Sequence, residues 1–209
     1  MKKFVVFALA GLTACASAQT RSTSAQASDA ITESDVRRIL STLAADSMEG
    51  RATGTPGANK AARFIASEMK ALGLTPAGDT GYFQRVPFVS GGRRGVSLVE
   101  SFDALAKLPE ADRRIGYNMI GVIPGIDPVL KDQVVAFAAH YDALGIRTPV
   151  NGDSIVNGAD DDASGVTTVL EIARAFASGP KPRRTILFIA TTGEEQGILG
   201  TQWYVAHPA

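Results

Sequence analysis

Cysteine is almost absent from this sequence of 209 residues, in which Cys15 is the only one. A single chain can therefore form no internal disulfide, and no cluster of thiolates is available to bind a metal. Histidine is nearly as scarce, with two residues in the chain. A metal site in this sequence would have to combine one or two imidazoles with carboxylates.

The sequence also lacks an excess of charge of either sign. Lysine and arginine total 21 residues, and aspartate and glutamate also total 21. This balance gives no electrostatic reason to expect nucleic acid or an anionic membrane as a partner. The hydrophobic share of 45% and the charged share of 20% are typical of a soluble globular protein, and the length suits one sizeable domain.

The apolar run near the N-terminus, residues 4–12, is too short to span a bilayer as a helix. It follows Lys2 and Lys3 and precedes small residues, which is the pattern of a secretory signal peptide over residues 1–18. Two cleavage sites compete. The stretch that ends at Cys15 resembles a bacterial lipobox and would place a lipid there, whereas residues 16–18 form a small-residue site that would release the protein. The sequence therefore predicts export, as a periplasmic or outer-membrane lipoprotein or as a secreted protein.

Residues 19–30 are rich in serine, threonine, alanine and glutamine, which predicts a flexible tether. The folded domain is then expected over residues 31–209. Within it, apolar residues at helical spacing predict a helix capped by Thr32, a second over 58–72 and a third over 165–177.

Nearly continuous apolar runs predict strands at 117–123, 133–139 and 184–190. Residues 78–116 are ambiguous, with room for one or two edge strands. Strand, helix and strand in succession favour an α/β domain with a largely parallel central sheet.

Three segments of the sequence carry polar groups at the predicted ends of strands or the start of a helix. They contain His140 with Asp142, the aspartates 160–162, and Glu194 with Glu195. Ligands of an open α/β sheet bind beyond the carboxyl ends of its strands, so these groups are expected at one edge. One imidazole with several carboxylates is a ligand set that suits zinc.

Each segment alone also has a simpler interpretation. A single histidine such as His140 at a strand end is often structural, and aspartates 160–162 could cap the helix that follows. A pair of glutamates at the start of a loop is common. The three segments together favour a metal, because carboxylates crowded at one edge need a cation to neutralise them.

Taken together, the three segments resemble the di-zinc aminopeptidases of clan MH (peptidase family twenty-eight). The shared features are a His-x-Asp after a strand, an Asp-Asp-Ala-Ser-Gly that opens a helix, and a Gly-Glu-Glu after the next strand. Residues 48–57, 118–125 and 197–201 are also similar to that family, so the resemblance covers residues 32–207. It implies the zinc exopeptidase fold, an α/β three-layer sandwich with a largely parallel central sheet.

The resemblance also implies a role for each site residue. His140 would bind one zinc ion, and Asp142 would accept a hydrogen bond from its second ring nitrogen. Asp161 would bridge two zinc ions, Glu195 would bind the second ion, and Glu194 would act as the general base. The peptide bond that follows Asp161 is often cis in this family.

The site of this family has two further ligands, an aspartate and a histidine, downstream of the two glutamates. The sequence ends at Ala209 before either of them, so residues 31–209 are expected to form an incomplete, truncated zinc peptidase domain. His207, the other histidine, is expected at a helix end rather than at the metal, because a helix C-terminus favours its charge.

The implied function is that of a metallo-aminopeptidase, a hydrolase that cleaves N-terminal peptide bonds with a metal-activated water. Its partners would be peptide substrates, without nucleic acid, and the membrane would be reached only through a lipid on Cys15. The alternative on the same fold is a non-catalytic ectodomain or an inactive truncated remnant. Every ligand position of the family that lies within the chain is filled, which favours the enzyme.

Overall fold

The computed structural model describes residues 29–91 and 95–209. The predicted signal peptide with Cys15, and the tether up to residue 28, lie outside the described residues. The helices are α2 (Glu33–Leu43), α3 (Pro56–Ala71), α4 (Phe102–Ala106), α5 (Ser164–Ser178) and α6 (Leu199–Ala206), with short helical turns η1 (Asp46–Arg51), η2 (Glu110–Asp112) and η3 (Ala159–Ala163). The strands are β1 (Thr75–Pro76), β2 (Phe83–Ser90), β3 (Val96–Leu98), β4 (Arg113–Ile123), β5 (Val134–His140), β6 (Gly145–Val150), β7 (Asp153–Val156) and β8 (Thr185–Thr191).

The central sheet has six strands in the order β3-β2-β4-β8-β5, with β1 paired to β4. Among the described strands, only β5 and β8 pair in parallel, and every other pair of this sheet is antiparallel. A parallel pair needs a long crossover, which α5 provides between β5 and β8. The α/β class is confirmed, but the expected largely parallel sheet is corrected to a mixed one. In the described residues, the strands β2, β3 and β4 are not joined by the helical crossovers that parallel pairing needs, and they pair antiparallel.

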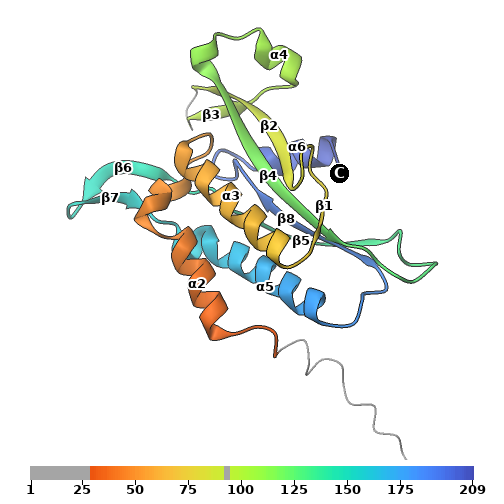
Figure 1. Ribbon diagram of the computed structural model, residues 1–209. Coiled ribbons are helices and arrows are strands. Elements are labelled where there is room, and N and C mark those ends of the chain that lie inside the picture. The colour runs from red at the N-terminus through yellow and green to blue at the C-terminus, as the bar shows by residue number, and fades with distance from the viewer. Residues whose placement is uncertain (1–28, 92–94) are drawn as a thin grey trace, which may run out of the picture.

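Helices cover both faces of the sheet, α2, α3 and α5 on one side and α6 on the other (Figure 1). On β8, Ile186 and Phe188 face the core beneath α2, α3 and α5, whereas Leu187 and Ile189 face the opposite side, where Tyr204 of α6 packs. The predicted three layers are therefore confirmed. Burial on both faces explains why this strand is an uninterrupted apolar run.

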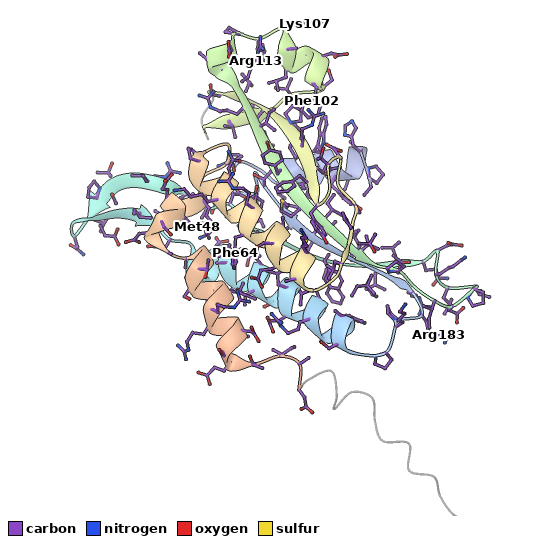
Figure 2. The ribbon with its side chains drawn as sticks, in the orientation of Figure 1. Met48, Phe64, Phe102, Lys107, Arg113 and Arg183 are labelled. Atoms are coloured by element: carbon purple, nitrogen blue, oxygen red, sulfur yellow. The ribbon has the colours of Figure 1, made fainter. Side chains whose placement is uncertain are left out.

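Three phenylalanines pack α5 onto the parallel pair of strands. The ring centroids of Phe137 on β5 and Phe188 on β8 lie 5.8 Å apart, and Phe176 of α5 lies 6.2 Å from the first and 6.4 Å from the second. Such aromatic pairs contribute about 0.5–1.5 kcal/mol beyond the burial of their surface. Met48 and Phe64 lie on the side of the sheet that α2, α3 and α5 cover (Figure 2).

Hydroxyl side chains begin the first two described helices. The Thr32 hydroxyl accepts from the backbone N–H of Asp35 at 3.1 Å, as the sequence predicts. Thr55 caps α3, which starts at Pro56 and so begins two residues before the predicted position. Gly73 follows the end of α3 with φ +72°, a conformation that glycine adopts without a steric penalty.

The described residues of the ambiguous stretch 78–116 form β2, β3, the short helix α4, η2 and the beginning of β4. Lys107 and Arg113 lie at the end of this region that is remote from α2 and α5 (Figure 2). The hairpin of β6 and β7 is not predicted by the sequence, and its Ile146 and Val150 are exposed. In the described part of the chain, no helix is long and apolar enough to span a bilayer.

Candidate metal centre

The polar segments meet at the carboxyl ends of the parallel strands β5 and β8. His140 is the last residue of β5 and pairs in register with Thr191, the last residue of β8. Glu194 and Glu195 follow β8 in the next loop. Because parallel strands end at the same edge, the imidazole and both glutamates open onto one side of the sheet, as the sequence predicts.

The Nε2 atom of His140 faces three carboxylates. It lies 3.0 Å from Asp161 Oδ1, 3.8 Å from Glu194 Oε2 and 3.9 Å from Asp162 Oδ2. The imidazole itself is 13% exposed, whereas the Asp161 side chain is 77% exposed. The ring is thus held by the protein while the aspartate beside it remains open to solvent.

The other ring nitrogen of His140 is committed to the main chain. Nδ1 lies 3.1 Å from the carbonyl oxygen of Asp142, and 3.8 Å from the carboxylate Oδ1 of the same residue. A carbonyl oxygen only accepts, so the short contact assigns a proton to Nδ1, and in the neutral ring Nε2 then carries the lone pair. The expected hydrogen bond from the ring is therefore made to the carbonyl of Asp142 rather than to its carboxylate.

This tautomer makes the contact between His140 Nε2 and Asp161 Oδ1 one between two acceptors. Two acceptors 3.0 Å apart repel each other unless a proton or a cation lies between them. Imidazole nitrogen and carboxylate oxygen are ligands that zinc accepts. The pair therefore fits a metal ion.

The three aspartates of the acidic turn divide between two tasks. Asp162 Oδ1 accepts from the Gly165 backbone N–H at 2.8 Å at the start of α5, and its Oδ2 accepts from the His140 backbone N–H at 3.2 Å. Asp161 instead faces the imidazole, and the peptide bond between it and Asp162 is cis. Asp160 is exposed. Asp162 thus caps the start of α5, whereas Asp161 places its carboxylate beside His140.

Asp142 is fully buried and holds the loop of the two glutamates against β5. Its carboxylate accepts from the backbone N–H groups of Glu194 at 3.2 Å and Glu195 at 3.3 Å, and from the Thr53 hydroxyl at 3.0 Å. Burial raises the pKa of Asp142, and the Glu194 N–H is the strongest of the contacts that lower it. The carboxylate therefore fixes the backbone of both glutamates relative to the histidine.

The pKa of Glu195 is raised, first by burial and then by the nearby charges of Asp161 and Asp142. Such crowding favours a bound cation. Within residues 29–91 and 95–209, however, no group of three or more His, Cys, Asp or Glu side chains is already arranged as a metal site. His140 and Asp161 are the pair that the fold brings into contact.

Comparison with known proteins identifies the family. Residues 118–209, which include all of these polar segments, match the model of peptidase family M28. Over residues 118–209, the chain belongs to peptidase family M28. Among curated relatives of this M28 chain, a probable zinc metalloprotease of Pyrenophora teres f. teres is 32% identical over 180 residues, covering 82% of the chain and 37% of the relative. Another, from Pyricularia oryzae, is 32% identical and covers 70% of the chain and 26% of the relative. The chain thus spans less than half the length of these relatives.

Solved structures confirm the fold of the M28 chain. A zinc aminopeptidase from Bacillus subtilis aligns with a TM-score of 0.59 and 19% identity, over 84% of this chain and 65% of that one. An aminopeptidase from Aneurinibacillus sp. strain AM-1 aligns with a TM-score of 0.60 and 16% identity, over 88% of this chain and 68% of that one. At these identities the likeness concerns the fold alone.

Several residues around these polar segments have no role in the sequence-based prediction. Thr53 Oγ1 lies 3.0 Å from Asp142 Oδ2 and 2.6 Å from Gln196 Oε1, yet a hydroxyl has one proton to donate. Because amide N and O are assigned from their partners, Gln196 donating to Thr53 gives a consistent chain that ends on Asp142. Thr53, Gln196 and Glu195 also line a cavity of about 770 Å³ with Arg114.

His207 lies outside this group, as predicted. It caps the C-terminus of α6, its Nδ1 lies 3.1 Å from the Trp203 carbonyl, and the two rings stack with centroids 3.9 Å apart. Its contacts are those of a helix end.

Proposed function

We propose that this chain carries part of the active site of an exported zinc exopeptidase that hydrolyses N-terminal peptide bonds. One observation supports this most directly. His140 has its Nδ1 committed to a carbonyl at 3.1 Å and points its lone-pair nitrogen at Asp161 Oδ1, 3.0 Å away, at the end of a buried strand. Ligand atoms of that type and orientation suit zinc.

His140, Asp161 and Glu195 would hold the metal, with two zinc ions in the whole protein. The main-chain carbonyl of Asp142 fixes the tautomer of the histidine, and its carboxylate fixes the backbone of Glu195. Zinc in such a site supplies Lewis acidity toward water and toward the carbonyl of the scissile bond. The raised pKa of Glu195 supports the role, because a ligand crowded by other carboxylates gains from a neighbouring cation.

Glu194 would be the general base. Its Oε2 lies 3.8 Å from His140 Nε2, its side chain is 39% exposed, and its backbone is held by Asp142. A carboxylate so placed can take the proton from the attacking water and deliver it to the leaving amine. Because the buried Asp142 carboxylate fixes the backbone of Glu194, the Glu194 carboxylate would stay within reach of the attacking water and of the leaving amine.

Export rests on the pattern of residues 1–18, and anchoring on the lipobox-like stretch that ends at Cys15. A lipid on Cys15 would hold the enzyme at a membrane, and cleavage after residue 18 would release it. Mass spectrometry of the mature N-terminus distinguishes the two.

The test of the catalytic proposal is Glu194→Gln in the zinc-loaded natural protein. Loss of the base should lower kcat by about 10²–10⁴-fold while the zinc content stays unchanged. Glu68→Gln is the matched control, because Glu68 pairs with Arg38 on the helices α3 and α2. Near-normal turnover of an amino-acid p-nitroanilide by Glu194→Gln would contradict the assignment. Equal cleavage of N-acetylated and free peptides would contradict an aminopeptidase.

A further inference from the structure

Arg51 is the largest fully buried side chain among the described residues. It ends η1, a turn that lies against the β6–β7 hairpin and outside the segments assigned to the metal. A guanidinium can be buried at this depth only if its N–H groups find acceptors. The identity of those acceptors shows what the residue does.

The guanidinium of Arg51 donates to main-chain carbonyls from separate segments. Nε donates to the Tyr141 oxygen at 2.6 Å, Nη1 to the Asn157 oxygen at 2.6 Å, and Nη2 to the Gly158 oxygen at 2.8 Å. Nη1 also donates to the Leu43 carbonyl at the end of α2. One side chain thus joins the strand end that carries the histidine to the residues that precede the acidic turn.

Gly158 meets the guanidinium at close range. A Cβ on Gly158 would lie 2.8 Å from Arg51 Nη2 and 2.6 Å from the Asp161 carbonyl oxygen, and its φ is +57°. The Gly158 carbonyl also accepts from the Ala163 N–H at 3.1 Å, which closes the turn that contains Asp161. Glycine is therefore required where the arginine and the acidic turn come together.

We infer that Arg51 is a positioning residue of the metal centre, which sets the place of Asp161 relative to His140. This inference rests on the proposed zinc site. Tyr141 adjoins the histidine, and Gly158 lies at the start of the turn that holds the aspartate. A change in the spacing of these two carbonyls moves the two proposed ligands apart, although Arg51 touches neither of their side chains.

The charge and shape of Arg51 both serve this role. Burial lowers its pKa, whereas the carboxylates of Asp142 and Asp162 raise it, so the cation lies in the field of the acidic site. The planar fork aims N–H groups in fixed directions at several acceptors. A lysine ammonium keeps the charge but is a compact point charge without that fork.

The test is Arg51→Lys in the natural protein, compared with Arg174→Lys. Arg174 also joins elements, since it contacts Glu171 at 3.1 Å and Asp35 of α2 at 3.5 Å, but its contacts lie away from the site. Zinc affinity is measured by competition with a chromophoric chelator, and kcat and KM on an amino-acid p-nitroanilide. We expect Arg51→Lys to lose about 10–100-fold in zinc affinity and in kcat, with KM little changed. Arg174→Lys should change melting temperature without changing zinc affinity.

Unchanged zinc affinity in folded Arg51→Lys would overturn the inference. If that variant does not fold, Arg51→Gln decides, because its side-chain amide enters the same space but donates fewer N–H groups to these carbonyls and leaves the backbone of the acidic turn unchanged. The same loss of zinc affinity then supports the inference, and wild-type affinity overturns it. Wild-type protein that binds no zinc would refute the proposed function itself, which separates that failure from a failure of the Arg51 role alone.

Discussion

Asn118 of β4 connects three segments through a fully buried amide. Its Nδ2 donates to the Gly200 carbonyl at 2.8 Å and to Gln84 Oε1 at 2.9 Å, and its Oδ1 accepts from the Thr192 N–H at 3.1 Å. Replacing Asn118 with leucine keeps the branching of the side chain, enlarges it by about the volume of two methyl groups, and removes all three hydrogen bonds. The main-chain groups of Gly200 and Thr192 are then left without these partners in a buried place.

The expected loss of stability follows from those two orphaned groups. A buried donor or acceptor left unsatisfied costs about 1–3 kcal/mol, so Asn118→Leu should lower the free energy of unfolding by about 2–6 kcal/mol. Gln84 Oε1 also loses its donor, although the same amide still donates to the His207 carbonyl at 2.6 Å, so the loss should lie in the upper part of this range. Leucine fills the space of the amide, which keeps water from replacing the lost partners.

Urea denaturation followed by far-ultraviolet circular dichroism measures this loss. The fluorescence of Trp203 should not be used alone, because this residue lies three positions from Gly200 and would report local changes. Asn59→Leu, on the partly exposed side of α3, is the matched control and should stay within about 0.5 kcal/mol of the wild type. A difference between the two variants below about 1 kcal/mol would refute the reasoning from the buried network.

Two smaller changes test other features of the structure. The Thr192 hydroxyl is buried and makes no hydrogen bond of ordinary geometry in the described part of the chain, although the Tyr141 hydroxyl lies near it. Thr192→Val should therefore leave the free energy of unfolding unchanged or raise it by up to about 1 kcal/mol in urea denaturation, and a clear loss would show that the two hydroxyls are hydrogen-bonded. Thr32→Ala removes the cap of α2 and should cost about 1 kcal/mol at neutral pH. Because the Thr32 hydroxyl is the largest cause that lowers the pKa of Asp35 below 3.8, part of this stabilisation is present above that pH and disappears as the pH falls through the folded-state pKa. The loss caused by Thr32→Ala should therefore shrink in acid, and an equal loss at neutral and acid pH would contradict this account.

The strands and helices around the site follow from local sequence. The run that becomes β8 is apolar because helices cover both of its faces, and the periodicity of α5 reflects the single face that it buries. The run that becomes β5 is equally apolar, although Val134 and Val135 are exposed in the described part of the chain. The start of α2 can be predicted because the Thr32 side chain itself accepts a hydrogen bond from the first turn of the helix. These features depend on near neighbours in the chain, so they can be predicted from the sequence.

The arrangement of the sheet could not be predicted in the same way. Residues 78–116 contain weak apolar alternation, and nothing local shows that β2 lies between β3 and β4 in an antiparallel arrangement. The β6–β7 hairpin is short and exposes its apolar residues, so burial leaves no pattern in its sequence. Pairing of such strands is decided by contacts between distant segments.

By itself, the sequence determined which groups are available at the site: one imidazole and a set of carboxylates, each placed by a strand end or a helix start, with no thiol in the folded domain. Only the tertiary structure decided what each group faces. It turned His140 Nε2 toward Asp161, assigned Asp162 to the start of α5, and brought Arg51 to carbonyls as far as 107 positions along the chain. Hydrogen bonds and ion contacts depend on distances of a few ångströms between segments, and the packing of the whole domain sets those distances.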